Sequence, residues 1–297
     1  MNLANIGLLV AAAVFHAVSQ ALIKGAKRSA VFSWLMLGVS TVLGIPALFF
    51  LGMVTPLGWI IVAASGLIEA IYFMSLSKAY SQGDLSSVYP IARGSAPLLT
   101  LLWSVLFLGE RPTRAGLLGI IVIVVGIYMS RLDSLSDWNK PMRNFFRGGA
   151  GWALLTGVFI SGYTTIDKIG TRQLNPVLYL YLVLAIAWLI QMPFRLVASQ
   201  RGTILDEIGH KSAGTWQLDV SACVRVIASM ALGFAAYTLV LLVMRTSPVS
   251  YVAPIREMSV VLGAWIGIRI MKEQGGIIRI VAAAMIVLGI SMIALGG

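Results

Sequence analysis

Apolar residues recur along this chain in runs of about 20, and polar residues gather in the short stretches between the runs. A run of that length crosses a lipid bilayer when it forms an α-helix. The first run follows a neutral Met1–Asn5 without a basic leader, so we expect a retained helix rather than a signal peptide. The pattern predicts ten membrane-spanning segments, at residues 6–23, 34–53, 58–80, 88–108, 114–130, 150–168, 176–197, 222–244, 250–271 and 277–295.

The second half of the chain repeats the first. One spacing of 163 positions relates three pairs of residues: Arg93 with Arg256, Glu110 with Glu273, and Gly126 with Gly289. A second spacing matches the first helices of the two halves, where Lys24 corresponds to Lys168. Each half therefore reads as five helices, residues 1–140 and 141–297, and an odd number inverts one half relative to the other. We predict an all-α membrane protein with ten transmembrane helices, arranged as two inverted five-helix repeats around a central cavity.

Composition supports the membrane assignment and narrows the chemistry. Hydrophobic residues make up 59% of the chain and charged residues 11%, whereas soluble domains carry roughly 25% charged residues. Cys223 is the single cysteine and only two histidines are present, so we expect no disulfide within the chain, no metal site and no cofactor. Phosphate-loop, zinc-protease and serine-hydrolase motifs are missing from the sequence, which argues against an enzyme.

The basic residues indicate an orientation rather than a nucleic-acid partner. The net charge is +11, but the lysines and arginines lie at helix ends and in short loops, as membrane topology requires. Of the 22 basic residues, 15 fall on the side that holds the loops after the odd-numbered helices. Because cytoplasmic loops carry the excess, we predict that both termini lie outside. The pattern leaves the oligomeric state open, and a monomer is compatible with it.

Acidic residues are scarce, and Glu69 lies near the middle of the third predicted span. A charge there is penalised by roughly 2.5–3.5 kcal/mol, so it usually faces a wet cavity or a partner. Tyr72 shares its helix face. Glu69 is therefore a candidate proton-titrating carboxylate or a site for a substrate ammonium; a salt bridge with Arg93 is the structural alternative. Asp167 falls near a helix end in the predicted spans.

Two arginines open predicted spans just after a proline. Arg93 follows Pro90, and Arg256 follows Pro254. Free helix-start amides, the helix dipole and a guanidinium together favour an anion such as a substrate carboxylate. The alternative is that each arginine snorkels or pairs within the protein, and Glu257 adjoins Arg256.

Further polar and aromatic residues inside the spans are weaker candidates. His16 is either a proton relay or a hydrogen-bonded packing residue, while Tyr163 and Tyr237 offer rings and hydroxyls to a substrate or simply pack. Glu110 and Glu273 end their helices beside basic residues. We expect these two glutamates to cap loops or to lock a closed gate, and not to contact the substrate.

The sequence also resembles a known family. The run from Ala79 to Gly94 (AYSQGDLSSVYPIARG), followed by Leu108–Pro112 (LGERP), is similar to EamA-type members of the drug/metabolite transporter superfamily, and so is the opening from Phe15 to Lys24. The second half matches these motifs only in part, for example in Pro-Ile-Arg-Glu at 254–257. The resemblance implies ten helices in two inverted repeats. It also implies a cavity lined by His16, Glu69, Tyr72, Arg93, Tyr163, Tyr237 and Arg256.

These observations favour a secondary transporter in a bacterial inner membrane. A zwitterion fits the available charges, with Arg93 for a carboxylate and Glu69 for an ammonium. Because the family that the sequence resembles includes many bacterial exporters of amino acids and related metabolites, we predict such a small-molecule substrate, exported by alternating access. The alternative within transport is a drug or cationic-metabolite exporter, in which Glu69 is the dominant group. An intramembrane enzyme or a sensor is a different class, and the sequence holds neither an activated nucleophile nor a soluble output domain.

Overall fold

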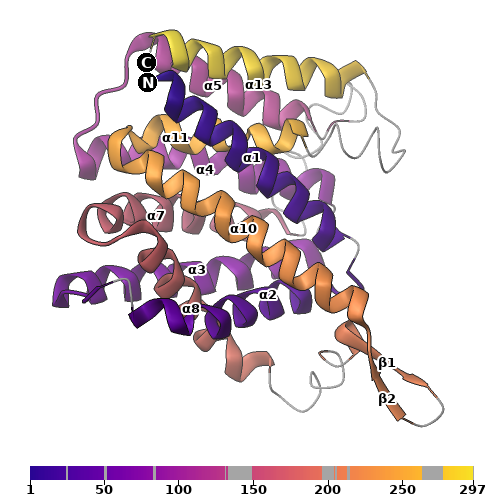
Figure 1. The fold of residues 1–297 in the computed structure, drawn as a ribbon. Helices are drawn as coiled ribbons and strands as arrows, with labels where there is room; N and C mark the ends of the chain where they lie inside the picture. Colours follow the sequence, from indigo (N-terminus) through magenta and orange to yellow (C-terminus); the bar gives the residue numbers. More distant parts are fainter. Residues whose placement is uncertain are drawn as a thin grey trace.

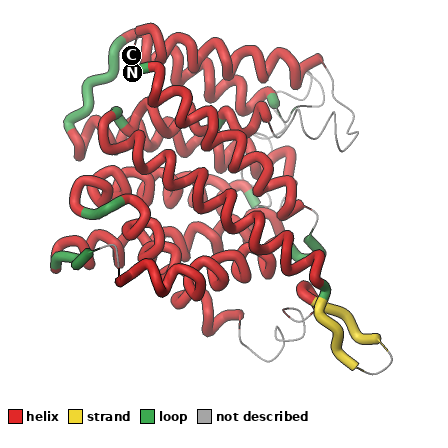
Figure 2. Tube along the Cα trace, viewed as in Figure 1, coloured by secondary structure: helices red, strands yellow, loops and turns green. Residues whose placement is uncertain are grey.

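The computed structural model describes residues 1–24, 26–49, 52–82, 85–130, 132, 149–195, 204, 206–212, 215–262 and 277–296. Long helices fill almost all of this part of the chain, and one short hairpin projects from them (Figures 1 and 2). The first repeat comprises α1 (Leu3–Lys24), α2 (Ser29–Gly44), the 3-10 helix η1 (Ile45–Phe49), α3 (Pro56–Gln82), α4 (Leu85–Leu108) and α5 (Arg114–Met129). The second comprises α7 (Ala150–Gln173), α8 (Pro176–Arg195), strands β1 (Gly209–Ser212) and β2 (Thr215–Leu218), α10 (Val220–Thr246), α11 (Val249–Arg256) and α13 (Ile277–Gly296).

Local side chains account for several of the helix starts. Thr113 Oγ1 accepts a hydrogen bond from Gly116 N at 3.0 Å, and Asp219 Oδ1 accepts one from Ala222 N at 3.1 Å. These short polar side chains satisfy amides that have no partner in the first turn of α5 and α10. Pro56 opens α3, where its missing N–H costs nothing.

Six described helices are long and apolar enough to cross a membrane, and they correspond to six of the predicted spans: α1, α3, most of α4, α8, α10 and α13. Helices α2 and α5 are apolar but shorter. Helix α7 falls outside this set; it contains several Gly, Ser and Thr residues, and Asp167, Lys168 and Arg172 lie in its last two turns. Helix α11 is brief and ends within the span expected at 250–271. The chain is thus a multi-pass helical membrane protein, and the count of ten spans stays a prediction.

Corresponding helices of the two repeats make corresponding contacts. Helix α1 packs on α10, and its counterpart α7 packs on α3, the counterpart of α10. The second helices of the halves, α2 and α8, pack on each other, as do the last, α5 and α13. Each pairing therefore recurs when the halves are exchanged, which is the packing expected of a duplicated architecture. The boundary between the repeats, predicted near 140, lies outside the described residues.

Glycines bring α5 and α13 into close contact. A Cβ atom built on Gly289 would lie 2.5 Å from the carbonyl oxygen of Gly119, and one built on Gly126 would lie 3.0 Å from that of Ala282. Backbones approach this closely only where side chains are absent. Gly126 and Gly289, one of the sequence-repeat pairs, therefore occupy the same interface from opposite sides.

The chain termini mark one end of the bundle, which we call the terminal face (Figure 1). There the start of α1 meets the end of α10, because Asn5 Nδ2 donates to Ser247 Oγ at 2.8 Å. The end of α13 meets the start of α5, because Thr113 Oγ1 donates to the carbonyl oxygen of Gly296 at 2.5 Å. We call the opposite end, from which the β1–β2 hairpin projects, the hairpin face.

Candidate substrate cavity

One cavity of about 700 Å³ runs through the described helices. Its walls come from both repeats, mainly α1, α2 and α3 of the first and α7, α8, α10 and the α11 region of the second. All of the substrate-contact candidates from the sequence line it: His16, Glu69, Tyr72, Arg93, Tyr163, Tyr237 and Arg256. Charged and aromatic side chains that are far apart in the sequence therefore meet in one cavity whose remaining lining is largely apolar.

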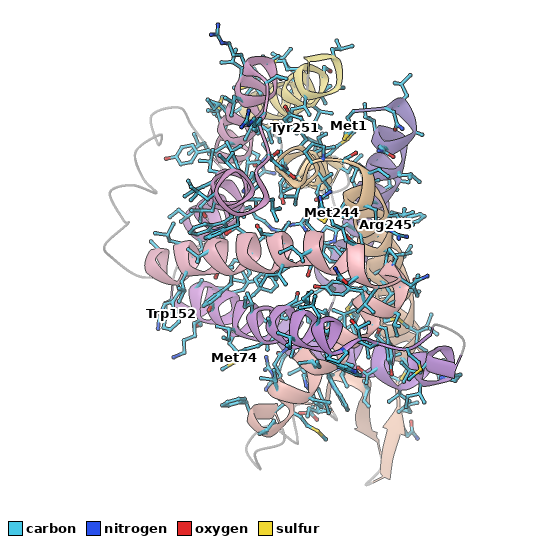
Figure 3. The ribbon with its side chains drawn as sticks, turned by 90° about the vertical axis from the view of Figure 1, so that its left-hand side faces the viewer. Met1, Met74, Trp152, Met244, Arg245 and Tyr251 are labelled. Atoms are coloured by element: carbon cyan, nitrogen blue, oxygen red, sulfur yellow. The ribbon has the colours of Figure 1, made fainter. Side chains whose placement is uncertain are left out.

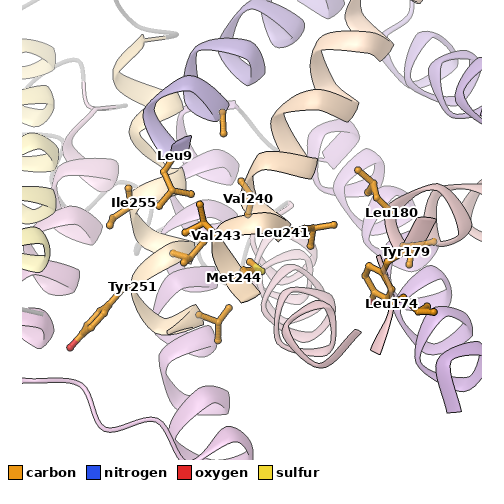
Figure 4. Packing of buried hydrophobic residues seen from close by; sticks show 14 of the residues in the cluster. Leu9, Leu174, Tyr179, Leu180, Val240, Leu241, Val243, Met244, Tyr251 and Ile255 are labelled. Atoms are coloured by element: carbon orange, nitrogen blue, oxygen red, sulfur yellow. The ribbon is translucent and has the colours of Figure 1, made fainter. Parts of the chain in front are cut away.

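The cavity extends toward the hairpin face. Its lining includes Ile23 near the end of α1, Ser81 near the end of α3 and Arg195 at the end of α8, all of which lie at that face. On the other side, buried apolar side chains separate it from the terminal face. Leu9 of α1 and Ile255 of α11 are fully buried there beside Val243 of α10 (Figure 4). The described structure is thus open at one end of the bundle and closed at the other.

Helix α11 breaks where the cavity begins. It ends at Arg256, and Glu257 N donates to the carbonyl oxygen of Pro254 at 3.0 Å in a tight turn before helix resumes at residue 258. Pro254 weakens the helix because it has no N–H to donate. Interrupted helices are the usual place for substrate groups in secondary transporters, because they expose backbone and charge inside the membrane. The break brings Arg256 to the cavity wall.

The two repeat-related arginines share one glutamate. Arg93 Nη1 lies 3.2 Å from Glu257 Oε1, and Arg256 Nε lies 3.9 Å from the same oxygen. Glu257 is only 1% exposed, and its Oε2 has no hydrogen-bond partner among the described residues. The alternative pairing of Glu69 with Arg93 does not occur here. The carboxylate of Glu257 thus neutralises part of the charge that two guanidiniums bring into the bundle.

Arg93 occupies a different place in its helix from the one expected. Helix α4 begins at Leu85, so Arg93 lies about two turns inside it rather than at the free amides of its start. Pro90 is tolerated within α4 and does not begin it. In this structure the helix-start amides therefore lie away from Arg93, and a substrate anion in the cavity would meet its side chain alone.

Aromatic rings form a continuous wall beside Glu69. The ring centroids of Tyr72 and Tyr163 are 5.6 Å apart, and those of Tyr163 and Tyr237 are 6.4 Å apart. The guanidinium carbon of Arg256 lies 5.6 Å from the ring centroid of Tyr237, in the range of a cation–π contact. Glu69 itself makes no hydrogen bond or ion pair with the part of the chain that the structure describes. Its carboxyl group is therefore available to a ligand in the cavity.

Asp167 is a functional candidate that the sequence did not reveal. The predicted sixth span ends at 168, but α7 continues to Gln173, which places Asp167 inside the helix. Its side chain is 1% exposed and accepts hydrogen bonds from the hydroxyls of Ser65, Tyr179 and Tyr237. Its hydrogen-bond partners come from three other helices, and the sequence does not show that these helices meet. The one signal in the sequence was therefore an acidic residue within reach of an apolar run.

The corner between α10 and α11, residues 244–251, is tied down at the terminal face. Glu110 Oε1 accepts from Val249 N at 2.7 Å, and its Oε2 accepts from Ser250 N at 3.0 Å. Lys168 Nζ donates to the carbonyl oxygens of Met244 and Ser247, so a buried ammonium caps the end of α10. Figure 3 shows Met244 and Tyr251 of this corner in the same part of the bundle as Met1.

These contacts lead to a prediction for the closed face. In Glu110→Ala the two α11 amides lose a charge-assisted acceptor, so the terminal face should open more often. A cysteine placed at Ala236, which lines the cavity, should then react faster with a membrane-impermeant maleimide added from the terminal face. The measurement uses a Cys223→Ser background and membrane vesicles of both orientations.

Glu207 supplies the matched control. Its carboxylate accepts from Lys27 N at 3.0 Å and Arg28 N at 2.8 Å, a comparable pair of backbone bonds at the hairpin face. Glu207→Ala should leave labelling from the terminal face unchanged. Equal labelling rates in Glu110→Ala and its parent would show that Glu110 does not hold this face shut. Glu273, its repeat equivalent, lies outside the described residues.

A helical bundle of two repeats that encloses a cavity holding charged side chains beside a broken helix is typical of multi-pass membrane transporters. Comparison with known families agrees: residues 3–132 and 147–295 each match the model of the EamA-like transporter family. The chain belongs to this family, whose members are membrane transporters of the drug/metabolite type.

A similar architecture is found among solved structures. A crystal structure described only as that of a protein aligns with 99% of this chain and 99% of its own, with a TM-score of 0.73 and 16% sequence identity. At that identity the likeness concerns the fold alone. No curated protein sequence matches this chain.

Proposed function

We propose that this chain is a secondary transporter that exports amino acids or closely related metabolites across a bacterial inner membrane by alternating access. The observation that carries the proposal is the pair of opposite charges in one cavity. Glu69 has no partner among the described residues, and Arg256 lies on the cavity wall at a helix break. A zwitterion presents an ammonium and a carboxylate together, and it satisfies both groups at once.

The contacts of the two arginines support different roles for them in this proposal. Arg93 is held by Glu257 at 3.2 Å, whereas Arg256 Nε is 3.9 Å from the same carboxylate and makes no hydrogen bond among the described residues. Arg256 is therefore better placed than Arg93 to receive a substrate carboxylate. The rings of Tyr72, Tyr163 and Tyr237 provide apolar contact for the body of the substrate.

The direction of transport follows from the predicted orientation. If both termini lie outside, the hairpin face is cytoplasmic and the cavity is open to the cytoplasm. Substrate would enter from there. Each repeat would then take up the arrangement that the other has in this structure, which would open the terminal face. The contacts of Glu110 and Lys168 around the α10–α11 corner are among those that would break in this step.

Counterflow in proteoliposomes tests the function. Vesicles loaded with one unlabelled amino acid should take up the same labelled amino acid, and the panel should include a nucleotide sugar and tetraphenylphosphonium. We expect exchange of amino acids with bulky apolar or aromatic side chains, because the cavity is wide and ring-lined. Exchange of tetraphenylphosphonium but of no amino acid would favour the cationic-metabolite exporter, for which Glu69 and the tyrosine rings suffice.

A further inference from the structure

Asp167 is a buried carboxyl group connected to the cavity by a single hydroxyl. We propose that Asp167 is the proton-binding residue of this protein, that it exchanges its proton with the cavity through Tyr237, and that the proton and a substrate ammonium exclude each other. The proton site itself follows from the geometry of Asp167. Its use in transport rests on the function proposed above.

The geometry places the carboxyl group between the cavity and the protein interior. Asp167 Oδ2 accepts from the hydroxyl of Tyr237 at 2.5 Å, and Tyr237 lines the cavity. Asp167 Oδ1 accepts from Ser65 Oγ at 2.6 Å and from the hydroxyl of Tyr179 at 2.7 Å. Of these donors, only Tyr237 is part of the cavity lining. A proton from the cavity therefore has one hydroxyl to cross before it reaches the carboxylate.

All three partners of Asp167 are hydroxyls, and this allows both protonation states. A hydroxyl can donate or accept, whereas a lysine or arginine can only donate. When Asp167 is ionised, all three hydroxyls donate to it. When Asp167 is protonated, it donates to one of them, and that hydroxyl turns its own hydrogen elsewhere. Glu257 differs, because its partner Arg93 stabilises only the ionised form.

The transfer through Tyr237 is balanced. A hydronium ion in the cavity donates a proton to the phenolic oxygen of Tyr237, and the phenolic hydrogen passes to Asp167 Oδ2. Tyr237 ends as a neutral phenol, Asp167 as a neutral carboxylic acid, and water remains in the cavity. Release is the reverse of this step. No other reactant is required.

The state of Asp167 decides what Tyr237 offers to a ligand. While Asp167 is ionised, Tyr237 donates to it and presents only oxygen lone pairs to the cavity, which suits an ammonium bound at Glu69. While Asp167 is protonated, the hydrogen of Tyr237 points into the cavity and opposes an ammonium. Glu69 and Asp167 also act on each other electrostatically, so a cation at one weakens binding of a proton at the other.

The surrounding charges fit this exchange. Arg93 on α4 is engaged by Glu257, and Lys168, next to Asp167, points to the end of α10. The titratable and charged groups that face Asp167 from the helices around it are Glu69 of α3, Tyr179 of α8, Tyr237 of α10 and Arg256 of α11. Because proton and ammonium compete, entry of a proton would drive exit of the substrate.

Infrared difference spectroscopy tests the proton site without any substrate. Purified protein in liposomes is titrated with acid, and the carbonyl stretch of protonated carboxyl groups is followed. We expect Asp167→Asn to lose one titrating band that Glu69→Gln retains. An unchanged set of bands in Asp167→Asn would overturn the proposal, whatever the protein transports.

A transport assay distinguishes the coupling of transport to protons from the binding of substrate. With the membrane potential clamped at zero, exchange of one proton per substrate across one pH unit drives about a tenfold accumulation. The probe is the labelled amino acid that gives the strongest counterflow in the wild-type protein. In Asp167→Asn we expect accumulation to disappear while counterflow at equal pH continues. Equal loss of both activities would show a structural or substrate-binding role instead and would overturn the proposal.

Two tyrosine variants provide a matched comparison. Tyr237→Phe and Tyr179→Phe each remove one hydroxyl from the same carboxylate, but only the first breaks the connection to the cavity. Tyr237→Phe should uncouple accumulation from the pH gradient, and Tyr179→Phe should remain coupled. Equal behaviour of the two variants would exclude the route through Tyr237. If no amino acid exchanges in the wild-type protein, the proposed function fails, and the infrared titration still decides the proton site.

Discussion

Replacing Glu69 with glutamine is expected to weaken substrate binding strongly while leaving the fold intact. Glutamine keeps the shape of the side chain but cannot hold an ammonium by charge. Hydrogen bonds to charged groups contribute about 1.5–3 kcal/mol, so the KM for counterflow should rise roughly ten- to a hundredfold. Glu69 makes no hydrogen bond or ion pair among the described residues, so the melting temperature in detergent should stay close to that of the parent.

Two further variants identify the cause of that loss. Glu207→Gln changes a carboxylate at the hairpin face, outside the cavity, and should transport normally. Arg256→Gln should impair exchange of amino acids as strongly as Glu69→Gln if the substrate is a zwitterion. If Arg256→Gln transports normally and Glu69→Gln does not, the substrate carries only a positive charge. Normal kinetics in Glu69→Gln would remove this residue from the mechanism.

Replacing Glu257 with alanine is expected to give the largest loss of stability. The variant leaves Arg93 and Arg256 in the bundle without the carboxylate that they share, and Glu257 is 1% exposed, so water cannot readily replace it. Removing one partner of a buried ion pair costs about 3–5 kcal/mol. The thermal unfolding transition in detergent should therefore move to a much lower temperature, measured by loss of helical circular dichroism.

A double variant distinguishes lost pairing from lost packing. Arg93→Gln combined with Glu257→Gln removes both charges; glutamine matches the shape of Glu257 and is two heavy atoms smaller than Arg93. It should be more stable than Glu257→Gln alone. The coupling between Arg93 and Glu257 is the deviation of the double variant from the sum of the Arg93→Gln and Glu257→Gln effects. A simple sum of the two single effects would indicate that Arg93 and Glu257 do not stabilise each other.

The sequence by itself determined the membrane class and the repeat, and its resemblance to a known family named seven of the residues that line the cavity. Span length and apolar composition are local properties, so the long helices followed from them with shifts at their ends. The rare charges inside apolar runs, such as Glu69, had to face a polar space, because lipid does not solvate them. The family match confirmed the resemblance drawn from the motifs around Arg93 and Glu110.

Only the tertiary structure decided which groups meet. Arg93 pairs with Glu257, which lies 164 positions away, and Asp167 collects hydroxyls from three different helices. It also located the break after Arg256 and the face at which the cavity is closed. Side-chain periodicity specifies the face of a helix but not the helix packed against it. Partners are set by how the helices are stacked and rotated against one another, and the sequence of a single helix does not contain that information.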